Sequence, residues 1–153
     1  MVKLQLLLTI GVATTLSAAQ AAPPADLSAM VAKARVSGQI VSWCRGEFRG
    51  GRRNAYAAAV RSATGGGRYL VFDGDLSVAE LAPFRDTPEL ACYTPAQARK
   101  LDQTIRSSET VSGRVAPVFP TTVVCAFVGD TSAVCWQYSP KARAFVQVGD
   151  WQT

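Results

Sequence analysis

The sequence predicts an α+β fold: a single small domain with a mostly antiparallel β-sheet, one or two helices and disulfide cross-links. Three observations lead to this prediction. The last 40 residues hold four short apolar segments separated by turn residues, a pattern typical of a β-meander. A strong helix-start signal lies before them, at Thr94. Four cysteines occur in a chain whose first residues resemble an export signal, and this combination favours disulfide bonds.

The first 21 residues have the three parts of a cleaved signal peptide. Lys3 supplies the positive charge, an apolar run follows from Leu4 to about Leu16, and Ala19-Gln20-Ala21 fits the small-x-small cleavage rule. The run is too short for a membrane anchor, which needs roughly 18 or more apolar residues. We therefore expect residues 22–153 to form one exported domain, periplasmic or secreted, with no transmembrane segment after cleavage.

The exported part is expected to stay basic. Losing the signal removes Lys3 and no acid, which leaves 15 basic and 11 acidic side chains. This modest excess permits weak attraction to anionic surfaces. Nucleic acid is a disfavoured partner for an exported chain of such low charge.

The even number of cysteines predicts two disulfides, and we expect the pairs Cys44–Cys92 and Cys125–Cys135. In the chain-entropy model they stabilise the fold by about 4 and about 2.8 kcal/mol. A zinc site is the disfavoured alternative, because the sequence has no CxxC pair and no histidine.

The second pair sets a condition on the turn between Cys125 and Cys135. Two cysteines of a hairpin can bond only where they are directly opposed across the strands. That requires an odd number of turn residues around Asp130, such as Gly129-Asp130-Thr131, because a two-residue loop would direct the sulfurs to opposite faces.

The N-terminal part of the domain is predicted to hold a helix and then a strand. Asp26 is the expected N-cap, and apolar residues follow at helical spacing, at Leu27, Met30, Val31 and Ala34. Gly38 is expected to end the helix. The strand covers Gln39–Phe48. Alternation places five of its residues on one face: Ile40, Ser42, Cys44, Gly46 and Phe48.

Two following segments are ambiguous. The alanines of Asn54–Ala63 favour a helix, but its shortness and the glycines Gly65–Gly67 before RYLVFD favour a β-hairpin, so we predict a strand. Phe72–Leu81 fits either a helical turn with a Ser77/Glu80 capping box or a turn and a short strand.

The clearest helix is predicted over Pro95–Ser107. Thr94 can cap it, Gln97 can complete a capping box, and proline suits the first helical position because its missing N–H costs nothing there. Its apolar stripe consists of Ala98, Leu101 and Ile105.

Four strand-like segments follow this helix and predict an antiparallel meander. They are Arg114–Phe119, Thr122–Val128, Ala133–Tyr138 and Ala144–Trp151. Ser139–Arg143 is one of the separating turns. Pro117 lacks a backbone N–H and would place the first segment at an edge or a bulge.

Residue chemistry excludes most common exported enzymes. Without histidine, Ser-His-Asp hydrolysis, Cys-His proteolysis and His-ligated zinc catalysis all lose an indispensable group. Carboxylate chemistry survives, since Asp73, Asp75 and Glu80 lie close in sequence and paired carboxylates can cleave glycosides. A histidine-free hydrolase is therefore the alternative function, and a polar turn is the structural alternative. No cofactor is expected.

The strongest functional signal is basic. Six arginines lie between residues 45 and 68. In the loop that holds Arg49, Arg52 and Arg53, bidentate guanidinium groups and two glycines would suit phosphate or carboxylate groups. The sequence thus predicts a non-catalytic binding or inhibitory module whose partner is an anionic envelope component or a protein. A solvated loop without a ligand is the structural alternative.

Aromatic residues could form a binding face or a core. They include Trp43, Trp136, Trp151, Tyr56, Tyr69, Tyr93 and Tyr138. Their positions in the predicted strands favour core packing. Trp136 and Tyr138 are expected to share the face opposite Cys135, and the sequence leaves open whether this face is buried.

Overall fold

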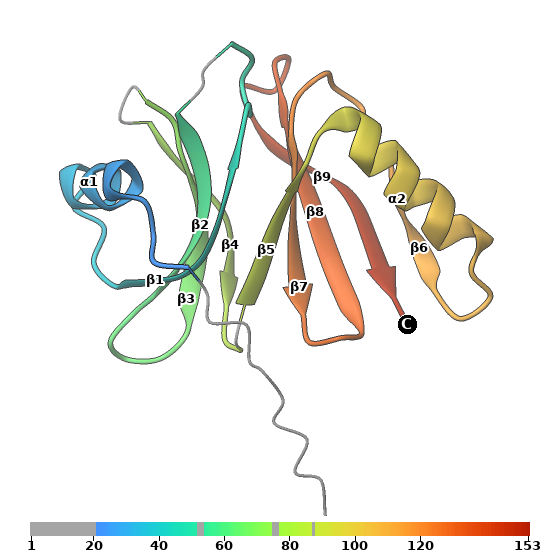
Figure 1. Ribbon diagram of the computed structural model, residues 1–153, viewed down its shortest axis with the longest axis horizontal. Coiled ribbons are helices and arrows are strands. Elements are labelled where there is room, and N and C mark those ends of the chain that lie inside the picture. The colour runs from blue at the N-terminus through green and yellow to red at the C-terminus, as the bar shows by residue number, and fades with distance from the viewer. Residues whose placement is uncertain (1–20, 52–53, 75–76, 87) are drawn as a thin grey trace, which may run out of the picture.

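The structure is a computed structural model with two antiparallel sheets, each carrying a helix on its outer face (Figure 1). It describes residues 21–51, 54–74, 77–86 and 88–153. The predicted α+β class is confirmed, and both predicted disulfides, Cys44–Cys92 and Cys125–Cys135, are present. Within the described ranges, neither helix is long and apolar enough to cross a membrane.

Sheet A is a four-stranded meander in the order β1-β2-β3-β4. Its strands are β1 (Gln39–Gly46), β2 (Ala55–Arg61), β3 (Gly67–Phe72) and β4 (Val78–Phe84). The strand prediction for Asn54–Ala63 is confirmed by β2, and β4 shows that the second half of Phe72–Leu81 is strand rather than a helical turn. Both faces of β2 are buried, so its small alanines pack where larger side chains would not fit.

One face assignment in β1 is wrong. A bulge between Ile40 and Ser42 shifts the register against β2 by one residue. Because a bulge reverses the alternation beyond it, Ile40 packs towards the helix on the outer face while Cys44 faces the other sheet. Phe48 lies beyond the end of the strand and is nevertheless buried in that inter-sheet core.

Helix α1 (Ala25–Lys33) covers the outer face of sheet A, and both of its predicted ends are wrong. Pro24 occupies the N-cap without a side-chain cap, and Asp26 lies inside the first turn, where its carboxylate accepts a hydrogen bond from the Tyr56 hydroxyl at 2.7 Å. The helix ends before Gly38. That glycine has φ +133°, and a Cβ there would stand 2.4 Å from the Arg61 carbonyl oxygen, so it serves close strand packing.

Sheet B has five strands in the order β5-β7-β8-β9-β6. They are β5 (Pro88–Tyr93), β6 (Ser112–Val115), β7 (Val123–Val128), β8 (Ser132–Ser139) and β9 (Ala144–Gln152). The meander prediction holds for the last three. The first predicted segment, Arg114–Phe119, is wrong beyond Val115, where the chain leaves β6, the edge strand beside β9.

The chain after β6 is a loop because a side chain of β8 takes its backbone hydrogen bonds. The buried Gln137 amide donates to the carbonyl oxygens of Phe119 and Thr121 at 2.6 Å each. Its oxygen accepts from the N–H groups of Val118 and Phe119 at 3.0 and 2.9 Å. One buried side chain thus replaces strand pairing for this segment.

The β7–β8 hairpin meets the odd-turn condition. Val128 pairs with Ser132, so the turn is Gly129-Asp130-Thr131, and Cys125 lies directly opposite Cys135 at a Cα–Cα distance of 4.1 Å.

Helix α2 (Pro95–Ser107) has the predicted bounds and capping box. The Thr94 hydroxyl accepts from the Gln97 N–H at 3.3 Å, and the Gln97 side-chain oxygen accepts from the Thr94 N–H at 2.9 Å. Ala98 and Ile105 pack against the Cys125–Cys135 disulfide on the outer face of sheet B.

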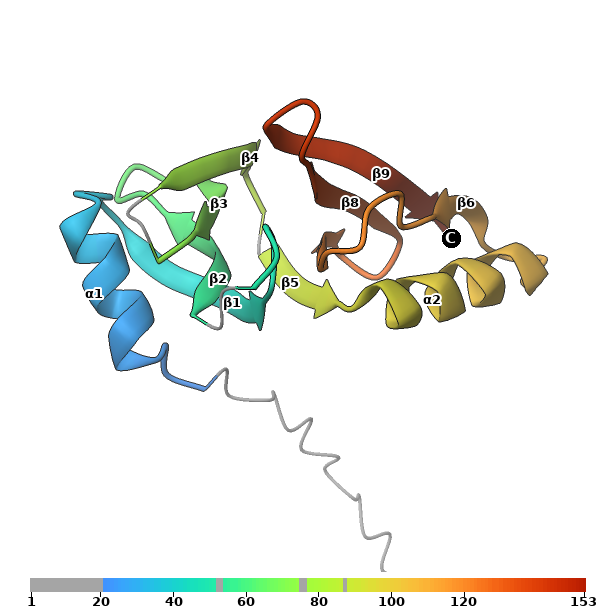
Figure 2. The ribbon, with the colours of Figure 1, turned by 90° about the horizontal axis from the view of Figure 1, so that it is seen from above.

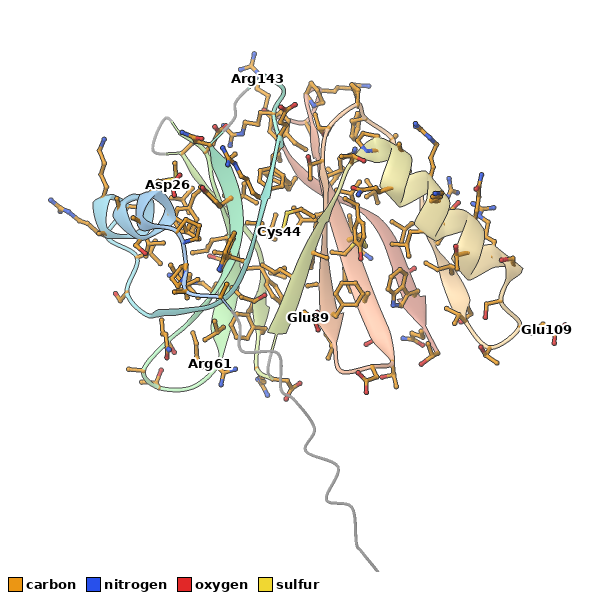
Figure 3. The ribbon with its side chains drawn as sticks, viewed as in Figure 1. Asp26, Cys44, Arg61, Glu89, Glu109 and Arg143 are labelled. Carbon is orange, nitrogen blue, oxygen red and sulfur yellow. A yellow bond between two sulfur atoms is a disulfide. The ribbon has the colours of Figure 1, made fainter. Side chains whose placement is uncertain are left out.

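The inner faces of the two sheets share one core. Along one side β1 and β5 are joined by the Cys44–Cys92 disulfide, and the Leu90 N–H donates to the Ser42 hydroxyl at 2.9 Å. Along the other side β4, the edge strand of sheet A, approaches β9 of sheet B (Figure 2). Arg143 lies at one end of the molecule, and Arg61 and Glu89 lie toward the other (Figure 3).

Candidate functional site

The structure describes one of the three arginines predicted to bind an anion. The Arg49 Nε lies 3.6 Å from the carboxylate of Asp73, which is 5% exposed, and the guanidinium group covers the Tyr138 ring at 5.0 Å. Arg49 therefore neutralises a buried acid and packs on an aromatic ring. Arg52 and Arg53 lie outside the described residues, and their anion-binding role stays a prediction.

The carboxylates of the hydrolase alternative are not brought together where the structure describes them. Asp73 follows β3 and pairs with Arg49, whereas Glu80 lies on β4 and pairs with Arg68 at 3.3 Å. Asp75 lies outside the described residues. Each described acid is thus held by its own arginine.

Metal coordination has no candidate centre in the part of the chain that the structure describes. No group of three or more His, Cys, Asp or Glu residues there could hold an ion. The four cysteines are all consumed by the disulfides.

A cavity of about 410 Å³ opens between the two sheets, at the end of the molecule opposite Arg49. Strands β3 and β4 of sheet A form one wall, and β7, β8 and β9 of sheet B form the other. Its apolar lining includes Tyr69, Leu81, Phe84, Ala126, Val134 and Trp136.

Three aromatic rings form the inner part of this inter-sheet pocket. The Tyr69 ring lies 4.9 Å from Phe84 and 6.0 Å from Trp136, and each residue is at most 9% exposed. Neither the Tyr69 hydroxyl nor the Trp136 indole N–H has a hydrogen-bond partner among the described residues. Neither atom is among the fully buried, unpaired polar atoms of the described residues, so both donors reach solvent and are available to a bound molecule.

Charged groups stand at the mouth of the pocket on the β4–β5 connection. Burial raises the pKa of Tyr69, and the negative charge of Asp86 raises it further, so the hydroxyl stays protonated and able to donate. Arg85 is exposed and forms no ion pair with the described residues. Arg61 donates to the Asp86 carbonyl oxygen at 3.1 Å and holds this connection in place.

The aromatic residues divide between core and surface. Trp136 and Tyr138 do share the face opposite Cys135, and this face is the inter-sheet core, where Trp136 reaches the pocket. Trp43 lies against Tyr56 under α1, with ring centroids 6.2 Å apart. Trp151 lies on the outer face of sheet B.

Sequence reasoning missed the pocket as a site, although it named two of its rings. Tyr69 and Trp136 were singled out as aromatics in strands, which is the only signal that the sequence carries. Their partners, such as Phe84 and Ala126, come from other strands and have no distinguishing motif.

Comparison of the chain with protein-family models, with curated proteins and with solved structures finds no match. The function must therefore be argued from the geometry of the site.

Proposed function

We propose that this chain is a non-catalytic binding protein that takes a small, largely apolar ligand with a hydrogen-bond acceptor into the inter-sheet pocket. One observation carries the proposal: an apolar cavity of about 410 Å³ that presents two solvent-accessible donors, the Tyr69 hydroxyl and the Trp136 indole N–H, without partners among the described residues. Ligand pockets are commonly apolar cavities of this size with a few convergent polar groups.

The ligand chemistry follows from the lining. Ring faces and aliphatic side chains favour an apolar and preferably planar body. A carbonyl, carboxylate or sulfonate oxygen on the ligand would accept from the Tyr69 hydroxyl or the Trp136 N–H, whereas a fully apolar molecule would displace solvent from both donors and leave them unpaired. Arg85 favours an anionic acceptor, and the neighbouring Asp86 opposes it.

A catalytic role has less support. Among the described residues, the pocket is lined by one carboxylate, Asp86, and by no serine, threonine, cysteine or lysine. The two-carboxylate mechanism needs a facing pair of acids. The described acids of the hydrolase alternative, Asp73 and Glu80, are held by separate arginines outside this pocket.

The proposal includes export to an oxidising compartment, the periplasm or the cell exterior. Two disulfides and an N-terminal signal-like segment support it, because disulfides persist in such compartments. Fractionation of cells that produce the tagged protein tests this part. Recovery in the cytoplasm with free thiols would contradict it.

The binding proposal is tested with 1-anilinonaphthalene-8-sulfonate, an aromatic anion whose fluorescence rises in apolar sites. Ala82 lines the pocket and is partly buried, so Ala82→Phe should fill it and weaken binding at least about tenfold. Tyr69→Phe removes one donor and should weaken binding about fivefold. Val118→Phe, at a position 66% exposed, is the matched control and should bind like wild type. Unchanged binding to Ala82→Phe would overturn the proposal.

The arginine-loop hypothesis has a separate test. Arg49 supports the fold through Asp73, so the informative variant is Arg52→Ala/Arg53→Ala with Arg49 retained. If envelope extract yields identical captured partners for wild type and this variant, the loop does not bind them.

A further inference from the structure

The outer face of sheet B is partly uncovered, and its side chains lie in ordered rows. Directly opposed residues of neighbouring strands share a face. One row crosses all five strands through Glu89, Phe127, Ala133, Trp151 and Gly113. At a strand spacing of about 4.8 Å, this row is roughly 19 Å long.

The next row explains where α2 lies. It contains small residues and the disulfide: Ala91, Cys125, Cys135, Gly149 and Val115. Helix α2 packs closely over this row through Ala98 and Ile105. The aromatic row is left beside the helix, and a groove of about 430 Å³ lies over it.

The strand register explains why the floor of this sheet B groove is aromatic. Ala133 stands between Phe127 and Trp151 and has a side chain too small to separate them. The two rings meet across it with centroids 5.4 Å apart. Leu101 and Ile105 of α2 and Tyr93 of β5 complete an apolar wall.

The charge of the groove contrasts with that of the chain. Glu89 at one end of the row and Asp130 in the β7–β8 turn both line it, and both are exposed. Neither has a hydrogen bond or ion pair in the described parts of the chain. No lysine or arginine in the described part of the chain lines the groove, although the chain carries a net charge of +5.

We propose that the sheet B groove docks an extended cationic peptide segment of a partner, with apolar side chains on Phe127 and Trp151 and lysine or arginine at Glu89 and Asp130. The apolar floor supplies area, the two unpaired acids supply charge complementarity, and the length of the row suits about five or six extended residues. An anionic membrane would be repelled by these acids. A second copy would bring two acidic rims together.

The proposal is tested by fluorescence anisotropy of the disulfide-bonded protein with a labelled hexapeptide of alternating leucine and lysine. A matched leucine–glutamate peptide is the control ligand. We expect the lysine peptide to bind at least tenfold more tightly at low salt, and added salt to narrow the difference. Glu89→Gln/Asp130→Asn should weaken the lysine peptide about fivefold, since exposed ion pairs contribute modestly.

Two further variants separate the contributions. Trp151→Ala should weaken the lysine peptide at least fivefold. Glu80→Gln removes an acid on β4 of sheet A, which pairs with Arg68 and does not line the groove, and should leave binding unchanged. Far-ultraviolet circular dichroism confirms that each variant is folded.

Several results would overturn the proposal. One is equal affinity for the two peptides. Another is no binding of the lysine peptide at 1 mM, which would mean a binding free energy weaker than about −4 kcal/mol. Loss of binding in Trp151→Ala without any effect of Glu89→Gln/Asp130→Asn would indicate an uncharged occupant. Self-association of wild type that Trp151→Ala abolishes would assign the groove to a second copy. Binding to anionic vesicles through Trp151 would assign it to a membrane.

Discussion

The two halves of the molecule share one plan, an antiparallel sheet with a helix on its outer face, and differ in how completely the helix covers the sheet. Sheet A presents large side chains to α1, including Tyr56, Leu70 and Phe72, and these pack with Leu27 and Val31 of the helix. Sheet B presents a row of small residues and a disulfide to α2, and keeps its large side chains in the adjacent row. The position of bulky residues on the sheet thus decides whether a face is closed or left as a groove.

The halves also differ in how their helices are held. The start of α2 is stabilised within its own sequence, by the capping box of Thr94 and Gln97. The start of α1 has no side-chain cap and is tied to the sheet by the hydrogen bond between Asp26 and Tyr56. One helix depends on local residues, and the other on a contact with a strand 30 residues away.

The largest expected effect comes from the disulfide that joins the halves. Cys44→Ala/Cys92→Ala should lower the free energy of unfolding by about 4 kcal/mol, whereas Cys125→Ala/Cys135→Ala, within sheet B alone, should cost about 2.8 kcal/mol. The loop closed by the first pair is longer, since its cysteines are 48 positions apart rather than 10. Urea unfolding of both variants measures this, and a larger loss from the second pair would contradict it.

A second large effect is specific to sheet B. Gln137→Leu should destabilise the protein by about 3 kcal/mol, because it removes four hydrogen bonds and leaves buried backbone groups of the β6–β7 loop unpaired. Thermal unfolding measures the loss. Gln103→Leu, the same change at an exposed position of α2, should lie within about 0.5 kcal/mol of wild type. Equal effects of the two changes would show that the Gln137 bonds are unimportant.

The helix starts give a smaller contrast. Thr94→Ala should cost about 1 kcal/mol, because it removes the side-chain acceptor of the capping box. Ser28→Ala is the matched loss of a hydroxyl in α1, where the side chain caps nothing, and should be nearly neutral. Urea unfolding compares them, and a cost for Ser28→Ala equal to that for Thr94→Ala would remove the distinction between the helices.

The smallest effect is the pH dependence of the α1 contact. The hydrogen bond from Tyr56 lowers the pKa of Asp26 below its usual value of 3.8. A lowered folded-state pKa means that the contribution is present above about pH 4 and is lost as the pH falls through the folded-state value. Asp26→Asn and Tyr56→Phe should both flatten the acid side of the stability profile. An unchanged profile in either variant would contradict the assignment.

Features that depend on neighbouring residues were predicted well. The capping box of α2 and its bounds follow from four consecutive residues, and the odd turn follows from the cysteine spacing. The strand state of β2 was also recoverable, because Gly65–Gly67 signals a hairpin return. In each case the interacting groups are close in sequence, so the local residue pattern is enough to predict the structure.

Features that depend on distant partners were missed. Strand β5 has little strand signal of its own and is ordered by pairing with β7, about 35 positions later. Aspartate is a residue type that commonly caps helices, but the Asp26 carboxylate accepts a hydrogen bond from the Tyr56 hydroxyl. The β6–β7 loop was predicted to be a strand. Nothing in the sequence indicates that the Gln137 side chain will form hydrogen bonds with the backbone groups of that loop.

The sequence by itself determined the α+β class, the turn length, the capped helix and the Cys125–Cys135 pair, since interactions between residues close in sequence dominate them. Cys44–Cys92 is then the pair that remains for the other two cysteines. The tertiary structure alone decided the pocket and the groove. The pocket arises where β3 and β4 meet β7 and β8, and the groove where Phe127 and Trp151 meet over Ala133. Both sites require side chains from separate strands to fall into register, and register is set by packing across the whole sheet.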